Sequence, residues 1–129
     1  MSSGNKTICI IGGGVAGLLA AVTAADEGAS VKLFEKMSKV GLKMGITGKG
    51  RCNLTNASDM EQLFANVVSN RKFLYSAFYS YDNEQVISFF ESHGMPTKTE
   101  RGNRVFPVSD HSSDVIAALS AALREQHVE

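Results

Sequence analysis

TICIIGGGVAG, residues 7–17, is the stretch of this sequence that decides its fold. Its first five residues are β-branched or apolar, which predicts a strand buried on both faces. The run leads directly into Gly12, Gly14 and Gly17, which satisfy the spacing GxGxxG. In such a strand-to-helix turn, the first glycine permits the tight turn and the second lets a pyrophosphate approach the backbone. The third lets the helix pack closely on the sheet, so the stretch predicts a dinucleotide-binding loop.

The residues that follow supply the context that this motif needs. Residues 15–27 are rich in alanine and leucine and predict a helix that can approach a sheet closely. Gly28 ends this helix, and residues 30–34 predict a second strand. Short connections on both sides favour a right-handed parallel crossover, the first half of a mononucleotide-binding fold.

Glu35 lies at the end of the second predicted strand, 18 residues after Gly17. This spacing is close to the roughly 20 residues expected for the carboxylate that accepts both hydroxyls of a ribose. A phosphate at the ribose 2′ position would be repelled, so FAD or NAD is favoured over NADP. The glycines could instead serve only to let a strand and a helix pack closely. That alternative does not explain the position of Glu35.

Residues 36–58 contain five basic residues, several glycines and no Asp or Glu, and we expect a long basic loop without regular helix. Lys36, Lys43 and Arg51 could offset phosphate charge, or could simply be solvated. A P-loop is excluded because position 43 is Lys and Lys49 is followed by Gly. RNA binding through residues 36–51 is disfavoured, because aromatic residues are not interleaved and the whole chain is neutral.

The second half of the chain predicts mainly helices. Residues 59–68 and 72–79 read as helical, and Asp82 can cap a further helix that ends at Gly94. A turn or hairpin around residues 104–106 precedes a final helix capped by Ser109 or Ser112. A third parallel strand is expected to begin after His127.

Size and composition are those of one globular domain. The 129 residues are 43% apolar and 20% charged, and 13 basic side chains balance 13 acidic ones. No long apolar segment predicts a membrane span or a leader. Cys9 and Cys52 suggest neither a disulfide framework nor a metal cluster, so we expect reduced thiols and a cytoplasmic location. Both are interpreted as packing residues, with Cys9 buried in the first strand.

Two further motifs carry a family resemblance. GLKMGITGKGRCNLTN, residues 41–56, and RVFPVS, residues 104–109, resemble signatures of BaiN-type and aminoacetone-oxidase-type FAD-binding enzymes, described as NAD(FAD)-utilising dehydrogenases. The resemblance extends over nearly the whole chain. Members of that family are longer and carry a substrate domain, so we expect residues 1–129 to be the N-terminal part of an FAD-binding domain. The expected class is an α/β, three-layer Rossmann-like fold with a parallel sheet.

The resemblance implies an FAD-dependent oxidoreductase, with NAD(P)H as a possible electron donor and a small organic molecule as substrate. It suggests Thr47 and Asn53 as partners of the flavin edge, with turn stabilisation as the alternative role. Two alternative functions stay open. The chain could be an NAD-dependent dehydrogenase domain, or a non-catalytic portion that needs further chain or a partner. No residue is singled out as a catalytic acid or base, and no metal or nucleic acid is expected. The predicted cofactor-binding residues are Gly12, Gly14, Ala16, Gly17, Glu35, Lys36, Lys43, Thr47, Gly48, Gly50, Arg51 and Asn53.

Overall fold

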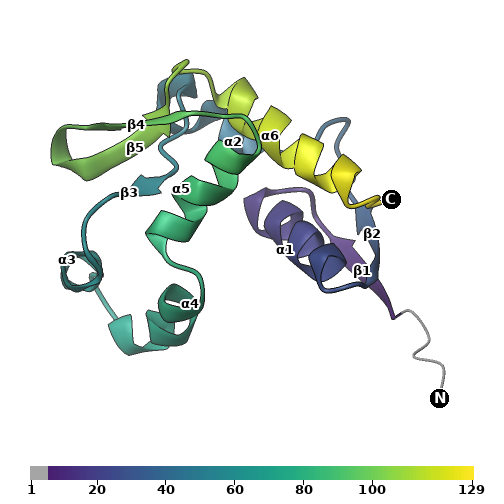
Figure 1. Cartoon of the computed structure of the whole chain (residues 1–129), viewed down its shortest axis with the longest axis horizontal. Coiled ribbons are helices and arrows are strands. Elements are labelled where there is room, and N and C mark those ends of the chain that lie inside the picture. Colours follow the sequence, from purple (N-terminus) through teal and green to yellow (C-terminus); the bar gives the residue numbers. More distant parts are fainter. Residues whose placement is uncertain (1–5) are drawn as a thin grey trace.

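The computed structural model describes residues 6–129 (Figure 1). The described part begins with strand β1 (Thr7–Ile11), helix α1 (Val15–Asp26) and strand β2 (Ser30–Phe34). The two strands are parallel, with Thr7 opposite Ser30 and Ile11 opposite Phe34. These bounds agree with the prediction within one residue, because apolar runs, glycines and a long alanine-rich stretch are strong local signals.

The C-terminal residue lies beside β2 and extends the parallel sheet. Helix α6 (Ser112–Glu125) leads into it. The amide of Glu129 donates to Val31 O at 3.1 Å, and the amide of Leu33 donates to Glu129 O at 2.7 Å. This is the hydrogen-bond pattern of a parallel neighbour, in the position where a third strand was expected. The described parallel sheet has two strands, and Glu129 lies on the free side of β2, where a Rossmann-type fold has its next strand.

Helices α1 and α6 pack on one face of this sheet and form the core with it (Figure 1). Alanines at the contacts let the helices approach each other and the strands closely. The fully buried members of this core include Leu18 and Ala21 of α1, and Val115 and Ala122 of α6.

The opposite face of the sheet is exposed, which corrects two predictions. Cys9 is exposed and Ile11 is 82% exposed, so β1 is not buried on both faces. Successive side chains of a strand point to opposite faces, and Ile10 takes the side of the core. Among residues 6–129, helices α1 and α6 form one layer on the sheet, and no described helix covers Cys9.

The basic stretch contains more regular structure than a loop. Helix α2 (Leu42–Ile46) and the 3-10 turn η1 (Thr47–Gly50) interrupt it. Met44 anchors α2 in the core, and this burial outweighs the low helix propensity of the glycines around it. The prediction that glycines exclude a helix here was therefore wrong for these five residues.

Four short helical elements follow. They are α3 (Met60–Ala65), η2 (Arg71–Leu74), α4 (Tyr75–Ser80) and α5 (Asn83–Ser92). The predicted cap of α5 is confirmed, because Asp82 accepts from the amide of Gln85 and the side chain of Gln85 accepts from the amide of Asp82.

The start of α6 differs from the prediction. His111 is its N-cap residue, and neither Ser109 nor Ser112 caps the helix. Ser112 is the first helical residue, and its hydroxyl donates to the carbonyl of Gly45 at 2.9 Å. This contact ties α6 to α2, and it uses the hydroxyl that was expected to act as a cap.

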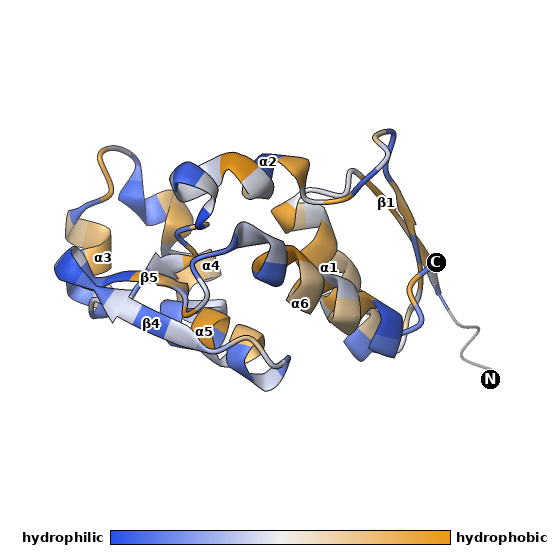
Figure 2. Ribbon diagram, turned by 90° about the horizontal axis from the view of Figure 1, so that it is seen from above, coloured by the Kyte–Doolittle hydropathy of each residue, from blue (hydrophilic) through white to orange (hydrophobic). Residues whose placement is uncertain are grey.

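A small antiparallel sheet completes the fold. Strands β4 (Thr97–Glu100) and β5 (Arg104–Pro107) form a hairpin, as predicted. Its turn is η3 (Arg101–Asn103), so residues 104–106, around which the turn was expected, belong to the second strand. The two residues of β3 (Thr55–Asn56) pair with β5, and they are too few to show a strand pattern in the sequence. Figure 2 shows the contrast between the apolar helix α1 and the hydrophilic strand β4.

Candidate functional site

The glycine loop between β1 and α1 has the geometry that its sequence predicts. Gly12 has a φ of +105°, and its amide donates to Phe34 O at 2.8 Å, which holds the turn against the end of β2. A Cβ atom at Gly17 would lie 1.9 Å from the carbonyl oxygen of Gly12. Gly17 therefore lets the helix approach the loop, as expected.

Gly14 is a glycine for a different reason. Its φ of −79° and ψ of 178° suit any residue, and a Cβ atom there would meet no atom within 4 Å. Neither backbone strain nor packing within the chain requires a glycine at this position. The exposed space at Gly14, called the cradle below, leaves room for a pyrophosphate to approach the backbone, and a side chain would fill it.

The N-terminus of α1 faces this cradle with unpaired amides. Gly14 is the N-cap residue and has no side chain to cap the helix, and the first turn contains no acid. Leu18 is the first residue whose amide bonds back into the helix, to Gly14 O at 2.9 Å. The amides of Val15, Ala16 and Gly17 therefore stay available, at the end of the helix that favours negative charge.

Glu35 is brought directly to the glycine loop. Its Oε2 accepts from the amide of Gly13 at 2.6 Å, and its Oε1 accepts from the amide of Met37 at 2.8 Å. The hydrogen bonds from Met37 and Gly13, together with nearby Lys36, hold the pKa of Glu35 below its ordinary value. The ionised carboxylate keeps lone pairs for further donors, as binding of two ribose hydroxyls requires.

The basic stretch begins beside the same loop. The amide of Gly41 donates to Gly13 O at 2.8 Å, so the start of α2 lies next to the glycine turn. The side chains of Lys36 and Lys43 are exposed. Gly48 and Gly50 have positive φ angles, and they form the tight turn that reverses the chain after α2.

An apolar cavity of about 310 Å³ opens between α1, the 44–54 segment, α5 and α6. Val15, the residue after Gly14, contributes to its lining, so the cavity adjoins the end of the glycine loop. Its polar lining consists of Thr47, Asn53 and Tyr81. The apolar lining residues are Val15, Leu19, Met44, Cys52, Leu54, Val86, Phe89, Phe90, Val115 and Leu119. Apolar walls with a few polar groups are typical of small-molecule sites.

The three polar residues of the cavity are held differently. The hydroxyl of Thr47 donates to Met44 O at 2.8 Å. The amide nitrogen of Asn53, assigned by its two carbonyl neighbours, donates to Thr55 O at 3.0 Å and Val105 O at 3.1 Å. Burial raises the pKa of Tyr81, so its phenol stays protonated and can donate a hydrogen bond at neutral pH.

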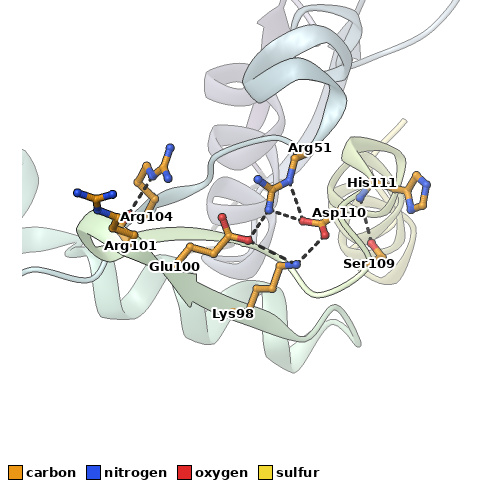
Figure 3. A network of polar contacts seen from close by, with 8 residues as sticks. All are labelled: Arg51, Lys98, Glu100, Arg101, Arg104, Ser109, Asp110 and His111. Atoms are coloured by element: carbon orange, nitrogen blue, oxygen red, sulfur yellow. Dashed lines mark hydrogen bonds and ion pairs between the residues drawn. The ribbon is translucent and has the colours of Figure 1, made fainter.

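Arg51 does not point into open solvent but joins an ion-pair network on the hairpin (Figure 3). Its Nε donates to Asp110 Oδ1 at 2.8 Å, and its Nη2 donates to Glu100 Oε1 at 2.5 Å. Lys98 donates to Asp110 Oδ2 at 2.6 Å. The guanidinium also lies 4.0 Å from the centre of the Phe106 ring. The charge of Arg51 is therefore shared with two carboxylates of this chain.

These contacts shift the ionisation of the whole network. The hydrogen bonds that Arg51 donates to Glu100 and Asp110 raise its pKa. Arg51 lowers the pKa of Glu100, while Lys98 and then Arg51 lower the pKa of Asp110. These shifts favour the charged forms of Arg51, Glu100 and Asp110.

Acidification is expected to remove the stabilisation that this network supplies. The carboxyl pKa values are lower in the folded chain than the ordinary values of 4.5 for Glu100 and 3.8 for Asp110. The contribution is therefore complete above these ordinary values and is lost as the pH falls through the folded values. We expect the difference in free energy of unfolding between the parent and Asp110→Asn to shrink toward zero on acidification below pH 4. Urea unfolding at a series of pH values measures it, and a constant difference would contradict the assignment.

The structure thus divides the predicted residues into three groups. Gly12, Gly14, Ala16, Gly17 and Glu35 lie together at the glycine loop, and Lys36 and Lys43 follow with exposed side chains. Thr47 and Asn53 line the adjoining cavity, with Gly48 and Gly50 shaping the turn between them, while Arg51 points to the hairpin. Prediction from sequence missed Val15 and Tyr81 in the cavity, and it missed the carboxylate partners of Arg51. The one sequence signal near these partners was the family resemblance of residues 104–109, which directly precede Asp110.

The comparison with protein families agrees with this geometry. The family model described as HI0933-like protein Rossmann domain matches residues 6–129. The chain belongs to this family. The HI0933-like assignment confirms the predicted Rossmann-type α/β class, the family resemblance and FAD as the cofactor of this type of domain. No helix among residues 6–129 is both long and apolar enough to cross a bilayer.

Two curated proteins and one solved structure resemble this HI0933-like chain. It is 36% identical over 123 residues to a 3-dehydro-bile acid delta(4,6)-reductase of Clostridium scindens, covering 94% of this chain and 29% of that protein. It is 39% identical over 87 residues to a ribosomal RNA dihydrouridine synthase of Haemophilus influenzae, covering 67% and 21%. The crystal structure of Thermovibrio ammonificans THI4 superposes with a TM-score of 0.57 at 15% identity, covering 96% and 36%. The chain therefore spans about a third or less of these relatives, and the structural likeness shows the fold.

Proposed function

We propose that the glycine loop, the first turn of α1 and Glu35 hold the ADP half of FAD, and that the protein transfers a hydride or electrons between a nicotinamide or oxygen and a small organic substrate. The observation that carries the proposal is the open cradle at Gly14, bordered by the free amides of α1. Pyrophosphate is the anion that such a cradle suits. FAD, when bound, supplies the redox chemistry, and the chain supplies binding and orientation.

We assign distinct tasks to the polar residues around the cradle. The amides of Val15, Ala16 and Gly17 would donate to phosphate oxygens, and the carboxylate of Glu35 would accept from the ribose hydroxyls. Exposed Lys36 and Lys43 would contribute positive charge without a fixed contact. Arg51 is left out of the phosphate contacts, because Glu100 and Asp110 already bind it.

The apolar cavity supports a small organic substrate. Its lining is mostly apolar, and Tyr81 would orient the substrate by a hydrogen bond, while Thr47 and Asn53 would hold the flavin edge beside it. The reductase from C. scindens acts, by its name, on a bile acid derivative, which agrees with an apolar substrate. NAD(P)H as electron donor belongs to the same proposal, and so does a cytoplasmic location, since both cysteines are unpaired.

RNA is the second candidate substrate, because the relative from H. influenzae is by name a ribosomal RNA dihydrouridine synthase. Retention of RNA that falls steeply with salt concentration would favour it. We favour the small molecule, because the cavity next to the loop is apolar and the chain has no net charge.

Replacing Glu35 with glutamine tests the ribose contact. The change removes the charge and one acceptor, and we expect the Kd for FAD to rise about 10- to 100-fold, the equivalent of one or two charge-assisted hydrogen bonds. Titration followed by flavin fluorescence measures it. Glu27→Gln is the matched control, because Glu27 is an exposed glutamate beyond the other end of α1. Equal FAD affinity of Glu35→Gln and the parent would contradict the assignment.

A further inference from the structure

The 47–53 segment has an unfavourable backbone conformation, which contacts from outside the segment must stabilise. Lys49 and Cys52 have φ angles of +57° and +59°, in the left-handed region that side chains seldom adopt. Two hydrogen bonds close the segment on itself, from the amide of Cys52 to Thr47 O and from the amide of Arg51 to Gly48 O. Such a turn persists only when its surroundings fix its shape.

Both ends of this segment line the cavity, and its far end is bound to the hairpin. Thr47 and Asn53 contribute to the lining, as does the buried Cys52 between them. The amide of Leu54 donates to Val105 O at 2.9 Å, and Asn53 reaches the same carbonyl. The contacts of Asn53 and Leu54 fix the end of the segment but not its middle.

Arg51 supplies a contact between the hairpin and the part of the 47–53 segment before Asn53. Its guanidinium reaches Glu100 on β4 and Asp110 just before α6 (Figure 3). It also lies over the buried ring of Phe106 on β5. A planar guanidinium can make these contacts at once, whereas a lysine cannot. Lys98 on the same hairpin completes a network of two cations and two carboxylates, which leaves no net charge to attract a phosphate.

We propose that Arg51 is a positioning residue, which locks the 47–53 segment to the hairpin and so holds Thr47 and Asn53 at the cavity wall without contacting the dinucleotide. The inference rests on the proposed function only for its effect on FAD affinity. The attachment of the segment to the hairpin does not depend on FAD and is measured separately.

The first test measures the lock without FAD. Cys52 is 4% exposed, so its reaction with a thiol reagent reports opening of the segment, in a Cys9→Ser background because Cys9 is exposed. We expect Arg51→Gln and Asp110→Asn each to speed the modification of Cys52 by about tenfold, as loss of one strong contact implies. Lys32→Gln, which breaks the separate ion pair with Glu129, is the control and should leave the rate unchanged. An unchanged rate in both network variants would overturn the proposal.

The second test compares FAD affinities. If Arg51 positions the segment, Asp110→Asn weakens FAD binding and alters the visible circular dichroism of the bound flavin, as Arg51→Lys does. If Arg51 were a phosphate ligand, Asp110→Asn would release its charge and leave FAD binding equal or tighter, and the proposal would fall. A parent protein that binds no FAD would reject the proposed function and leave the result with Cys52 standing.

Discussion

Replacing Gly14 with valine is expected to abolish FAD binding while leaving the melting temperature nearly unchanged. The backbone at Gly14 suits any residue, and a Cβ atom meets nothing within 4 Å, so the chain tolerates the side chain. The valine occupies the cradle where the pyrophosphate must lie. Loss of the charge-assisted hydrogen bonds there should weaken FAD binding by about 100-fold or more. Calorimetric titration and thermal unfolding of the same variant measure both effects.

Ala20→Val is the matched control for this experiment. Ala20 lies on the exposed side of the same helix, beyond the first turn, so the substitution adds the same methyl groups away from the cradle. We expect the control to bind FAD like the parent. Gly14→Val with the FAD affinity of the parent would show that the phosphate does not lie at this loop.

Replacing Gly17 with alanine is expected to damage the fold itself. The added methyl group would lie 1.9 Å from the carbonyl oxygen of Gly12, and this oxygen belongs to the backbone and cannot rotate away. Separating α1 from the loop should cost about 3 kcal/mol or more, as severe overpacking does. For a domain of this size, the melting temperature should fall by about 10 °C or more.

Gly45→Ala provides the comparison for Gly17→Ala. Gly45 is also in a helix, but a Cβ atom there would meet only Ile116 Cδ1, at an ordinary 3.9 Å. Alanine is the better helix former, so this variant should be as stable as the parent or more so. A Gly17→Ala variant with the melting temperature of Gly45→Ala would contradict the packing role of Gly17.

The parts of the fold that were predictable are those fixed by neighbours in the sequence. The strand–glycine–helix stretch sets its own geometry, and Asp82 caps α5 through a residue three positions away. Glu35 was predictable because the length of one helix and one strand brings it back to the glycine loop. These signals depend on local conformation and on one short crossover.

The remaining features depend on contacts between distant residues. Arg51 and Asp110 are 59 residues apart, so no local pattern distinguishes a paired arginine from one that is free to bind phosphate. The hydroxyl of Ser112 bonds to a carbonyl 67 residues away instead of capping its own helix. Cys9 was expected to be buried, but exposure of a strand depends on which faces of the sheet are covered, and an apolar run does not carry that information.

The most direct test of the central claim is the visible absorbance spectrum of the parent protein after it is mixed with FAD and desalted. The account predicts retained flavin bands, with close to one FAD per chain, and no retained bands for Gly14→Val treated in the same way. A folded parent protein that keeps no flavin, or keeps as much as Gly14→Val does, would contradict FAD binding at the glycine loop.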